Sequence, residues 1–211
     1  MKTNKILKIV AFFIIVSTSA FAQKKQQIVG FDKIEVKTVN RSISKDSIIF
    51  MNTNKGDGLV IFENIAFKKG TIELDLLGQN LKGKSFVGFA FNIEDNATYE
   101  AIYFRPFNFL AKEATRKSHM LQYICQPKYT WRELRTTRTG EFENEIKTPP
   151  NPEDWFHLKI EVGEKEVRVY VNNSKVPDLV VERLTEIKSD TIGLWVGNGS
   201  SGKFKGLKIN N

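Results

Sequence analysis

The sequence has few residues that cross-link a chain or bind metal ions. Its 211 residues include one cysteine, Cys125, and two histidines, His119 and His157. A single cysteine cannot form an internal disulfide, so stability must come from the packing of a hydrophobic core. We expect Cys125 to be buried and unreactive, because free cysteine is among the most buried residue types. There is also no internal repeat and no low-complexity tract.

Long apolar runs are scarce and lie near the N-terminus. Three lysines precede the apolar run 9–16, and a small-residue cleavage site ends at Ala22. This pattern predicts a secretory signal peptide over residues 1–22, cleaved between Ala22 and Gln23; an uncleaved anchor is the alternative. A lipoprotein anchor is not indicated, because Gln23 is not cysteine. No later segment is apolar enough to span a membrane, so we expect a secreted or periplasmic protein with one domain, residues 23–211.

Acidic residues are scarce in the middle of the chain. Residues 105–138 hold eight basic side chains and two acidic ones, whereas residues 141–154 hold five acidic and one basic. The formal net charge is +8, or +5 without the three lysines of residues 1–22. A basic field attracts anions, and an acidic polysaccharide is a more natural partner than nucleic acid for an exported chain without a nucleic-acid motif. The alternative is a solvated surface of uneven charge.

Strand patterns fill most of the remaining sequence. Apolar and polar residues alternate with period two, turn residues separate the runs, and residues 110–117 suit a helical turn or a lid-like loop. About a dozen short strands predict an all-β fold, an antiparallel two-sheet sandwich or jelly roll. The predicted strands are 31–39, 47–51, 59–62, 71–77, 86–93, 98–106, 119–125, 130–137, 155–162, 167–171, 191–196 and 204–209.

Four segments resemble the concanavalin A-like, laminin-G-like jelly-roll superfamily. They are GTIELDLL (70–77), FVGFAFNIEDNATYEAIYFRPFNF (86–109), WFHLKIEVGEKEVRVYVNN (155–173) and TIGLWVGNGSSGKFKGLKI (191–209). The second segment also resembles secreted bacterial members that include 3-keto-disaccharide hydrolase domains. The superfamily contains lectins, carbohydrate-binding modules, adhesion domains and glycoside hydrolases, so the resemblance implies the fold without settling the function.

The resemblance also bears on catalysis. Laminarinase-type hydrolases of this superfamily carry three acids at alternate positions of one strand, and retaining glycosidases need two carboxyl groups about 5 Å apart. Here Glu73 and Asp75 occupy the first two positions, but the third is Leu77. The missing acid is the one that would donate a proton. Glu73 and Asp75 are therefore expected to be solvent-facing residues opposite an apolar strand face.

A candidate binding face lies between residues 99 and 138. If Ile102 faces the core, the predicted strand 98–106 turns its tyrosines and an arginine to the other side; Leu134 orients the predicted strand 130–137 in the same way. Sugars stack on aromatic rings and accept hydrogen bonds from arginine. The alternative is that these aromatics belong to the core. The predicted ligand-binding residues are Tyr99, Tyr103, Arg105, Gln122, Trp131 and Arg135.

Candidate catalytic and metal-binding residues are few. His119 and Glu100 are the only residues that we name as a possible acid or base. Glu100 falls on the core side, where a carboxylate must pair, and an arginine partner is expected. His157 and Trp195 are expected to be structural. Turn oxygens near residues 57 and 94–96 suit calcium, but no loop has calcium-binding spacing, so no metal or other cofactor is predicted.

Three functions remain open at this point. The first is an exported, non-catalytic glycan-binding domain, for which Trp131 and Arg105 are the expected anchors. The second is a glycoside or keto-disaccharide hydrolase or lyase, which needs a positioned acid or base. The third is a structural or adhesion module of the cell envelope, which predicts a flat apolar patch and no small pocket.

Overall fold

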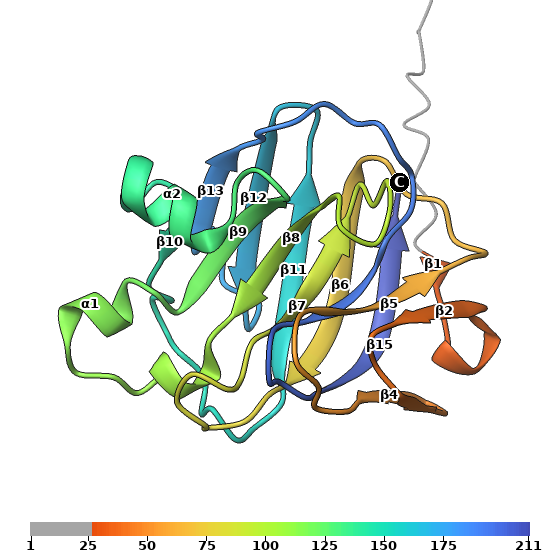
Figure 1. Cartoon of the computed structure of the whole chain (residues 1–211), viewed down its shortest axis with the longest axis horizontal. Helices are drawn as coiled ribbons and strands as arrows, with labels where there is room; N and C mark the ends of the chain where they lie inside the picture. The colour runs from red at the N-terminus through yellow and green to blue at the C-terminus, as the bar shows by residue number, and fades with distance from the viewer. Residues whose placement is uncertain (1–26) are drawn as a thin grey trace, which may run out of the picture.

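The structure is a computed structural model that describes residues 27–211, so the predicted signal peptide and its cleavage site lie outside the described residues. Two antiparallel sheets are stacked face to face (Figure 1). The eight-stranded sheet has the order β13 (Leu179–Glu182), β12 (Glu166–Val171), β11 (Phe156–Val162), β6 (Gly70–Leu77), β15 (Gly202–Asn210), β4 (Ile48–Met51) and β3 (Ile43–Lys45), with β1 (Gln27–Ile28) paired to β15.

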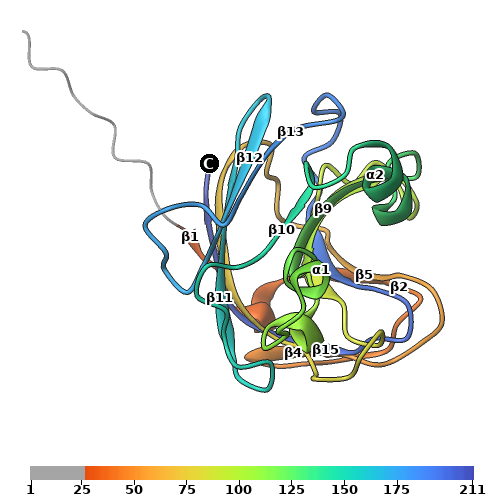
Figure 2. The same ribbon diagram turned by 90° about the vertical axis from the view of Figure 1, so that its left-hand side faces the viewer.

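The seven-stranded sheet has the order β10 (Glu143–Asn144), β9 (Leu121–Gln126), β8 (Tyr99–Phe104), β7 (Val87–Phe91), β14 (Gly193–Val196), β5 (Gly58–Phe62) and β2 (Val36–Val39). Short helices join the strands: η1 (Phe31–Lys33), η2 (Pro106–Asn108), α1 (Ala114–Lys117) and α2 (Trp131–Thr137). Both α1 and α2 lie beside the seven-stranded sheet, away from the eight-stranded one (Figure 2). The predicted jelly-roll sandwich is confirmed.

The core lies between the two sheets. In β8, Ile102 and Phe104 face inward, and the Phe104 ring meets Phe156 of the opposite sheet at a centroid distance of 4.9 Å. Every residue of β7 and of β8 is buried. Since strand side chains alternate, these central strands are covered on both faces, and something other than the core must cover their outer face.

One predicted strand is wrong, and another begins later than predicted. Residues Trp131–Thr137 form α2, not a strand. Phe31 begins the 3-10 turn η1, so of the strand predicted over 31–39 only Val36–Val39 forms, as β2. The Thr130 hydroxyl accepts a hydrogen bond from the Glu133 amide at 3.2 Å, which caps the start of α2. Thr-x-x-Glu is a helix-start signal, and its local hydrogen bond prevails over the alternation of the side chains.

The helices of residues 27–211 are all short, and none is long and apolar enough to cross a membrane.

Candidate functional site

The outer face of the seven-stranded sheet carries an aromatic floor. Tyr103 of β8 and Trp195 of β14 are both register partners of Gly88 in β7, and their rings meet at a centroid distance of 4.9 Å. A Cβ on Gly88 would lie 2.7 Å from the Cα of Tyr103, so only glycine permits this approach. Trp195 was expected to be structural; it lies on the outer face of this sheet, where its buried ring lines the cleft.

A cleft of about 530 Å³ lies over this floor. The floor comes from strands, with Ile124 and Gln126 of β9 beside the two aromatic rings, whereas the walls come from the connections between strands. The wall residues are Asp57, Lys82, Gly83, Phe86, Arg105, Phe107, Asn108, Arg116, His119, Trp131, Arg135, Gly197 and Asn198. Four of them are Lys or Arg and one is an acid, so the cleft presents mainly positive charge to a ligand.

Helix α2 brings two of the predicted residues into the cleft. Trp131 and Arg135 are one helical turn apart and lie on the same side of α2, and the guanidinium carbon of Arg135 lies 5.1 Å from the Trp131 ring centroid. Trp131 is 41% exposed. An exposed tryptophan at the wall of a cleft offers a flat apolar surface on which a ligand ring can stack.

Arg105 lies buried at the junction of floor and wall. Its Nη2 donates to the Tyr103 hydroxyl and to Gln122 Oε1, both at 2.6 Å, and its Nη1 donates to the backbone oxygen of His119 at 3.0 Å. These partners are neutral, so they fix the guanidinium without cancelling its charge. The nearest carboxylate oxygen, on Glu143, is 3.9 Å away.

Glu143 of β10 holds a group of cleft residues in place. Its buried carboxylate accepts two hydrogen bonds from Arg135, at 2.9 and 2.5 Å, and one from His119 Nδ1 at 2.9 Å. Burial lowers the pKa of His119 below its ordinary value of 6.5, and Arg135 and Arg105 lower it further, although Glu143 acts in the opposite direction. His119 is therefore a neutral imidazole at neutral pH.

The other end of the cleft contains Asp57. Trp195 Nε1 donates to the Tyr99 hydroxyl at 3.0 Å, and that hydroxyl donates to Asp57 Oδ2 at 3.1 Å. Burial raises the pKa of Asp57, although the Tyr99 hydrogen bond and Arg41 oppose this shift. Arg41 also donates to the backbone oxygens of Gly56 and Gly197, which fixes the two connections that supply this wall.

The six predicted ligand-binding residues take different positions. Tyr103, Arg105, Trp131 and Arg135 line the cleft. Tyr99 is buried and does not line the cleft; its hydroxyl donates a hydrogen bond to the wall residue Asp57. Gln122 is fully buried behind Arg105, and its Nε2 has no hydrogen-bond partner among the described residues. Four of the six predicted residues therefore line the cleft, and two lie behind them.

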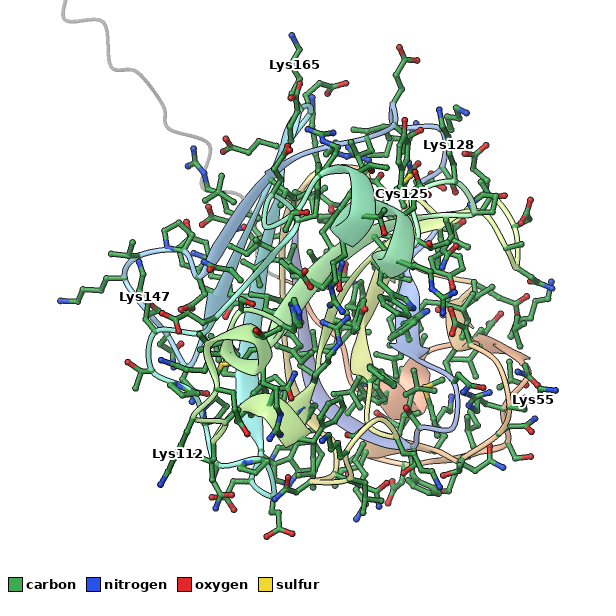
Figure 3. The ribbon with its side chains drawn as sticks, turned by 60° about the vertical axis from the view of Figure 1, so that its left-hand side comes forward. Lys55, Lys112, Cys125, Lys128, Lys147 and Lys165 are labelled. Atoms are coloured by element: carbon green, nitrogen blue, oxygen red, sulfur yellow. The ribbon has the colours of Figure 1, made fainter. Side chains whose placement is uncertain are left out.

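The basic stretch 105–138 is not a single surface. Only Arg105, Arg116 and Arg135 of its eight basic residues line the cleft, where Lys82 from outside the stretch joins them. Figure 3 shows Lys112 and Lys128 pointing outward at well-separated edges of the molecule.

The remaining sequence candidates lie outside the cleft. Glu100 is fully buried and pairs with Arg183, as expected for a structural pair. Its Oε2 accepts hydrogen bonds from Arg183 Nε at 3.1 Å and from the Tyr123 hydroxyl at 2.6 Å. The pair lies on the core face of β8, which removes Glu100 as a catalytic candidate for this cleft. Cys125 is buried as expected, and burial, followed by Glu100, raises its pKa to about 11.

Glu73 and Asp75 lie on the outer face of the other sheet, remote from the cleft. His157, the register partner of Asp75, contacts both: Nδ1 lies 2.8 Å from Asp75 Oδ1, and Nε2 lies 3.3 Å from Glu73 Oε2. The two carboxylates are partly exposed rather than fully solvent-facing, because His157 covers them.

Several residues of the site were not identified from the sequence. Asp57 had been considered only as a turn oxygen, and Glu143 had been counted within an acidic stretch. Lys82, Phe86 and Asn198 carry no local signal, since they reach the cleft only because the jelly-roll connections converge there.

No protein-family model and no curated protein matches the sequence. Solved structures do match. The carbohydrate-binding module CBM66 from Bacillus subtilis has 14% identity and a TM-score of 0.60, over 83% of this chain and 95% of that one. A Bacillus licheniformis β-glucanase has 10% identity and a TM-score of 0.53, over 92% and 95%. The exoplasmic/lumenal domain of VIP36, in a Ca²⁺/Man3GlcNAc-bound form, has 10% identity and a TM-score of 0.53, over 83% and 82%.

The chain has a concanavalin A-like jelly-roll fold. At these identities the concanavalin A-like neighbours establish the fold alone, and the resemblance to 3-keto-disaccharide hydrolases remains a prediction.

Proposed function

We propose that the protein is an exported carbohydrate-binding protein and that its ligand lies in the cleft of the seven-stranded sheet. The observation that carries this proposal is the exposed Trp131 beside fixed arginines, over a floor of Tyr103 and Trp195. Aromatic rings offer flat apolar surfaces for stacking, and guanidinium groups donate hydrogen bonds to hydroxyl and carboxylate oxygens. Carbohydrate-binding and lectin neighbours with the same fold support the proposal. Export rests on the signal-peptide pattern of residues 1–22.

The charge of the cleft favours an anionic saccharide. Four basic side chains line the cleft, whereas Asp57 is the only acid among the described wall residues. The basic residues are Lys82, Arg105, Arg116 and Arg135. An acidic polysaccharide therefore remains the preferred ligand class. The flat apolar patch expected of an adhesion module is not what this face presents.

The experiment is a binding titration with neutral and uronate-containing oligosaccharides, at low and high salt. Replacement Trp131→Ala is expected to weaken binding at least tenfold, or about 1.4 kcal/mol, because the stacking surface is lost. Binding of the anionic ligand should also weaken as salt rises.

The matched control is Trp155→Ala. Trp155 is half-buried and makes a cation–π contact with Lys205 of the eight-stranded sheet, with 4.4 Å between Nζ and the ring centroid. This substitution should leave affinity unchanged. Equal affinity in wild type and Trp131→Ala would reject the cleft as the binding site.

A further inference from the structure

His119 and Glu143 form a histidine–carboxylate pair at the wall of the cleft. Nδ1 of His119 lies 2.9 Å from Glu143 Oε2, and the carboxylate is only 3% exposed. The carboxylate is an acceptor that Arg135 already engages through both of its oxygens. Nδ1 must therefore carry the proton, which leaves Nε2 of the neutral ring with a free lone pair.

This Nε2 is available to a ligand. His119 lines the cleft, and its side chain is 18% exposed. Among the described residues, Nε2 has no hydrogen-bond partner, and the contacts of the ring with Ser118 Oγ and Glu143 Oε2 both involve Nδ1. A neutral imidazole held in one tautomer by a buried carboxylate is the usual arrangement of a general base.

Two guanidinium groups lie beside this base. Arg105 donates to the His119 backbone oxygen at 3.0 Å, and Arg135 shares the Glu143 carboxylate with the His119 ring. Arg135 uses Nε and Nη2 for that carboxylate, which leaves Nη1 for a ligand. A carboxylate bound here would have its charge neutralised, and neutralisation makes the neighbouring C–H bond more acidic.

The cleft is poorly equipped for the two-carboxylate hydrolysis of glycosides. That reaction needs one carboxylic acid and a second carboxylate across the bond. Asp57 is the only acid among the described wall residues. The Glu143 carboxylate lies behind the wall, where it is buried and bound by Arg135 and His119. A base beside cationic groups suits elimination instead.

We propose that the protein cleaves a uronate-containing polysaccharide by β-elimination, with His119 as the catalytic base. The proposal rests on carbohydrate binding in this cleft and adds a reaction to it. Arg105 and Arg135 bind the C6 carboxylate, and His119 Nε2 removes the proton from C5. The C5–H and C4–O4 bonds break, a C4=C5 double bond forms, and the imidazolium returns its proton to the departing O4. Atoms and charges balance, and no co-reactant is needed.

The test uses polygalacturonate and alginate as anionic polymers and a neutral β-glucan as control. Elimination is followed by the ultraviolet absorbance of the conjugated double bond, and new reducing ends are measured in parallel. The wild-type protein is expected to produce both signals from a polyuronate. Replacement His119→Gln should lower kcat by about 10²–10⁴-fold with little change in KM or in titrated affinity.

The pH profile gives a second readout that needs no variant. Since neutral His119 is the base, kcat/KM should fall as the pH drops through a pKa below 6.5. The charged groups that face the ring are Glu143 from β10, Arg135 from α2 and Arg105 at the end of β8.

The outcomes separate this proposal from carbohydrate binding itself. Binding of polyuronates without a double-bond signal overturns the elimination and leaves the binding function standing. Reducing ends without that signal indicate hydrolysis and also overturn it. Undiminished turnover in His119→Gln removes His119 as the base. Failure to bind any saccharide rejects both the reaction and the proposed function.

Discussion

Gly88 determines how closely the two floor aromatics approach. Tyr103 and Trp195 flank it on neighbouring strands, and a side chain there would meet the Tyr103 backbone and Cβ at 2.7 Å. Burial raises the pKa of Tyr103 to about 12, so the floor of the cleft presents a neutral phenol at any ordinary pH.

Replacement Gly88→Ala is expected to cost about 1–3 kcal/mol of folding free energy, because the strands must separate to admit the methyl group. It should also weaken saccharide binding by distorting the floor. Urea unfolding and a binding titration measure the two effects. A variant with native stability and affinity would show that the floor tolerates a side chain at this position.

At the residue scale, the sequence predicted which face each side chain of β8 takes. Ile102 faces the core, Tyr103 and Arg105 face the cleft, and Glu100 pairs with an arginine on the core side, because strand alternation is local. It did not separate Tyr99 from Tyr103. Both are on the outer face, but only the folded structure shows that Tyr103 lines the cleft and Tyr99 does not.

At the scale of elements, α2 shows why a wrong secondary structure can still give useful site residues. Residues four apart lie on one face both of a strand and of a helix, so Trp131 and Arg135 stay together in either conformation. Glu133 differs: a strand would place it on the same face, yet in α2 it is exposed and does not line the cleft. The capping pattern at Thr130 was the overlooked signal.

Removal of the cap is expected to loosen α2. Replacement Thr130→Ala should cost about 1 kcal/mol of stability and weaken saccharide binding, because Trp131 is the first residue of the helix. Thr136→Ala is the matched control, since Thr136 is exposed on the same helix and its hydroxyl bonds only to the Arg132 backbone. Thermal unfolding and affinity measurements on both variants make the comparison. Equal effects would mean that the cap does not hold Trp131 in place.

At the scale of the whole molecule, Arg183 links the two layers of the sandwich. It follows β13 of the eight-stranded sheet, yet its guanidinium reaches Glu100 in β8 of the seven-stranded sheet. Asn92 and Tyr123 complete the hydrogen bonding of the carboxylate, at 2.8 and 2.6 Å. An arginine partner was predictable from the burial of Glu100, but its identity depends on the topology.

Replacement Arg183→Met is expected to destabilise the protein by about 3–5 kcal/mol, since it leaves the Glu100 carboxylate buried without its partner. The double variant with Glu100→Gln should recover part of this loss, because the uncompensated charge is then removed. Urea unfolding of both single variants and the double variant gives the coupling energy. Strictly additive effects would contradict a direct pairing.

The separation of the cleft into a strand floor and connection walls has a consequence for engineering. Residues 79–85, 105–119 and 127–138 contribute most of the wall, and they also contain the core residues Phe109 and Leu134. The wall positions of these segments, with Phe109 and Leu134 kept constant, are therefore suited to randomisation in a display library, much as variable loops are diversified on a constant framework. Selection from such a library would yield binders for new glycans on an unchanged scaffold.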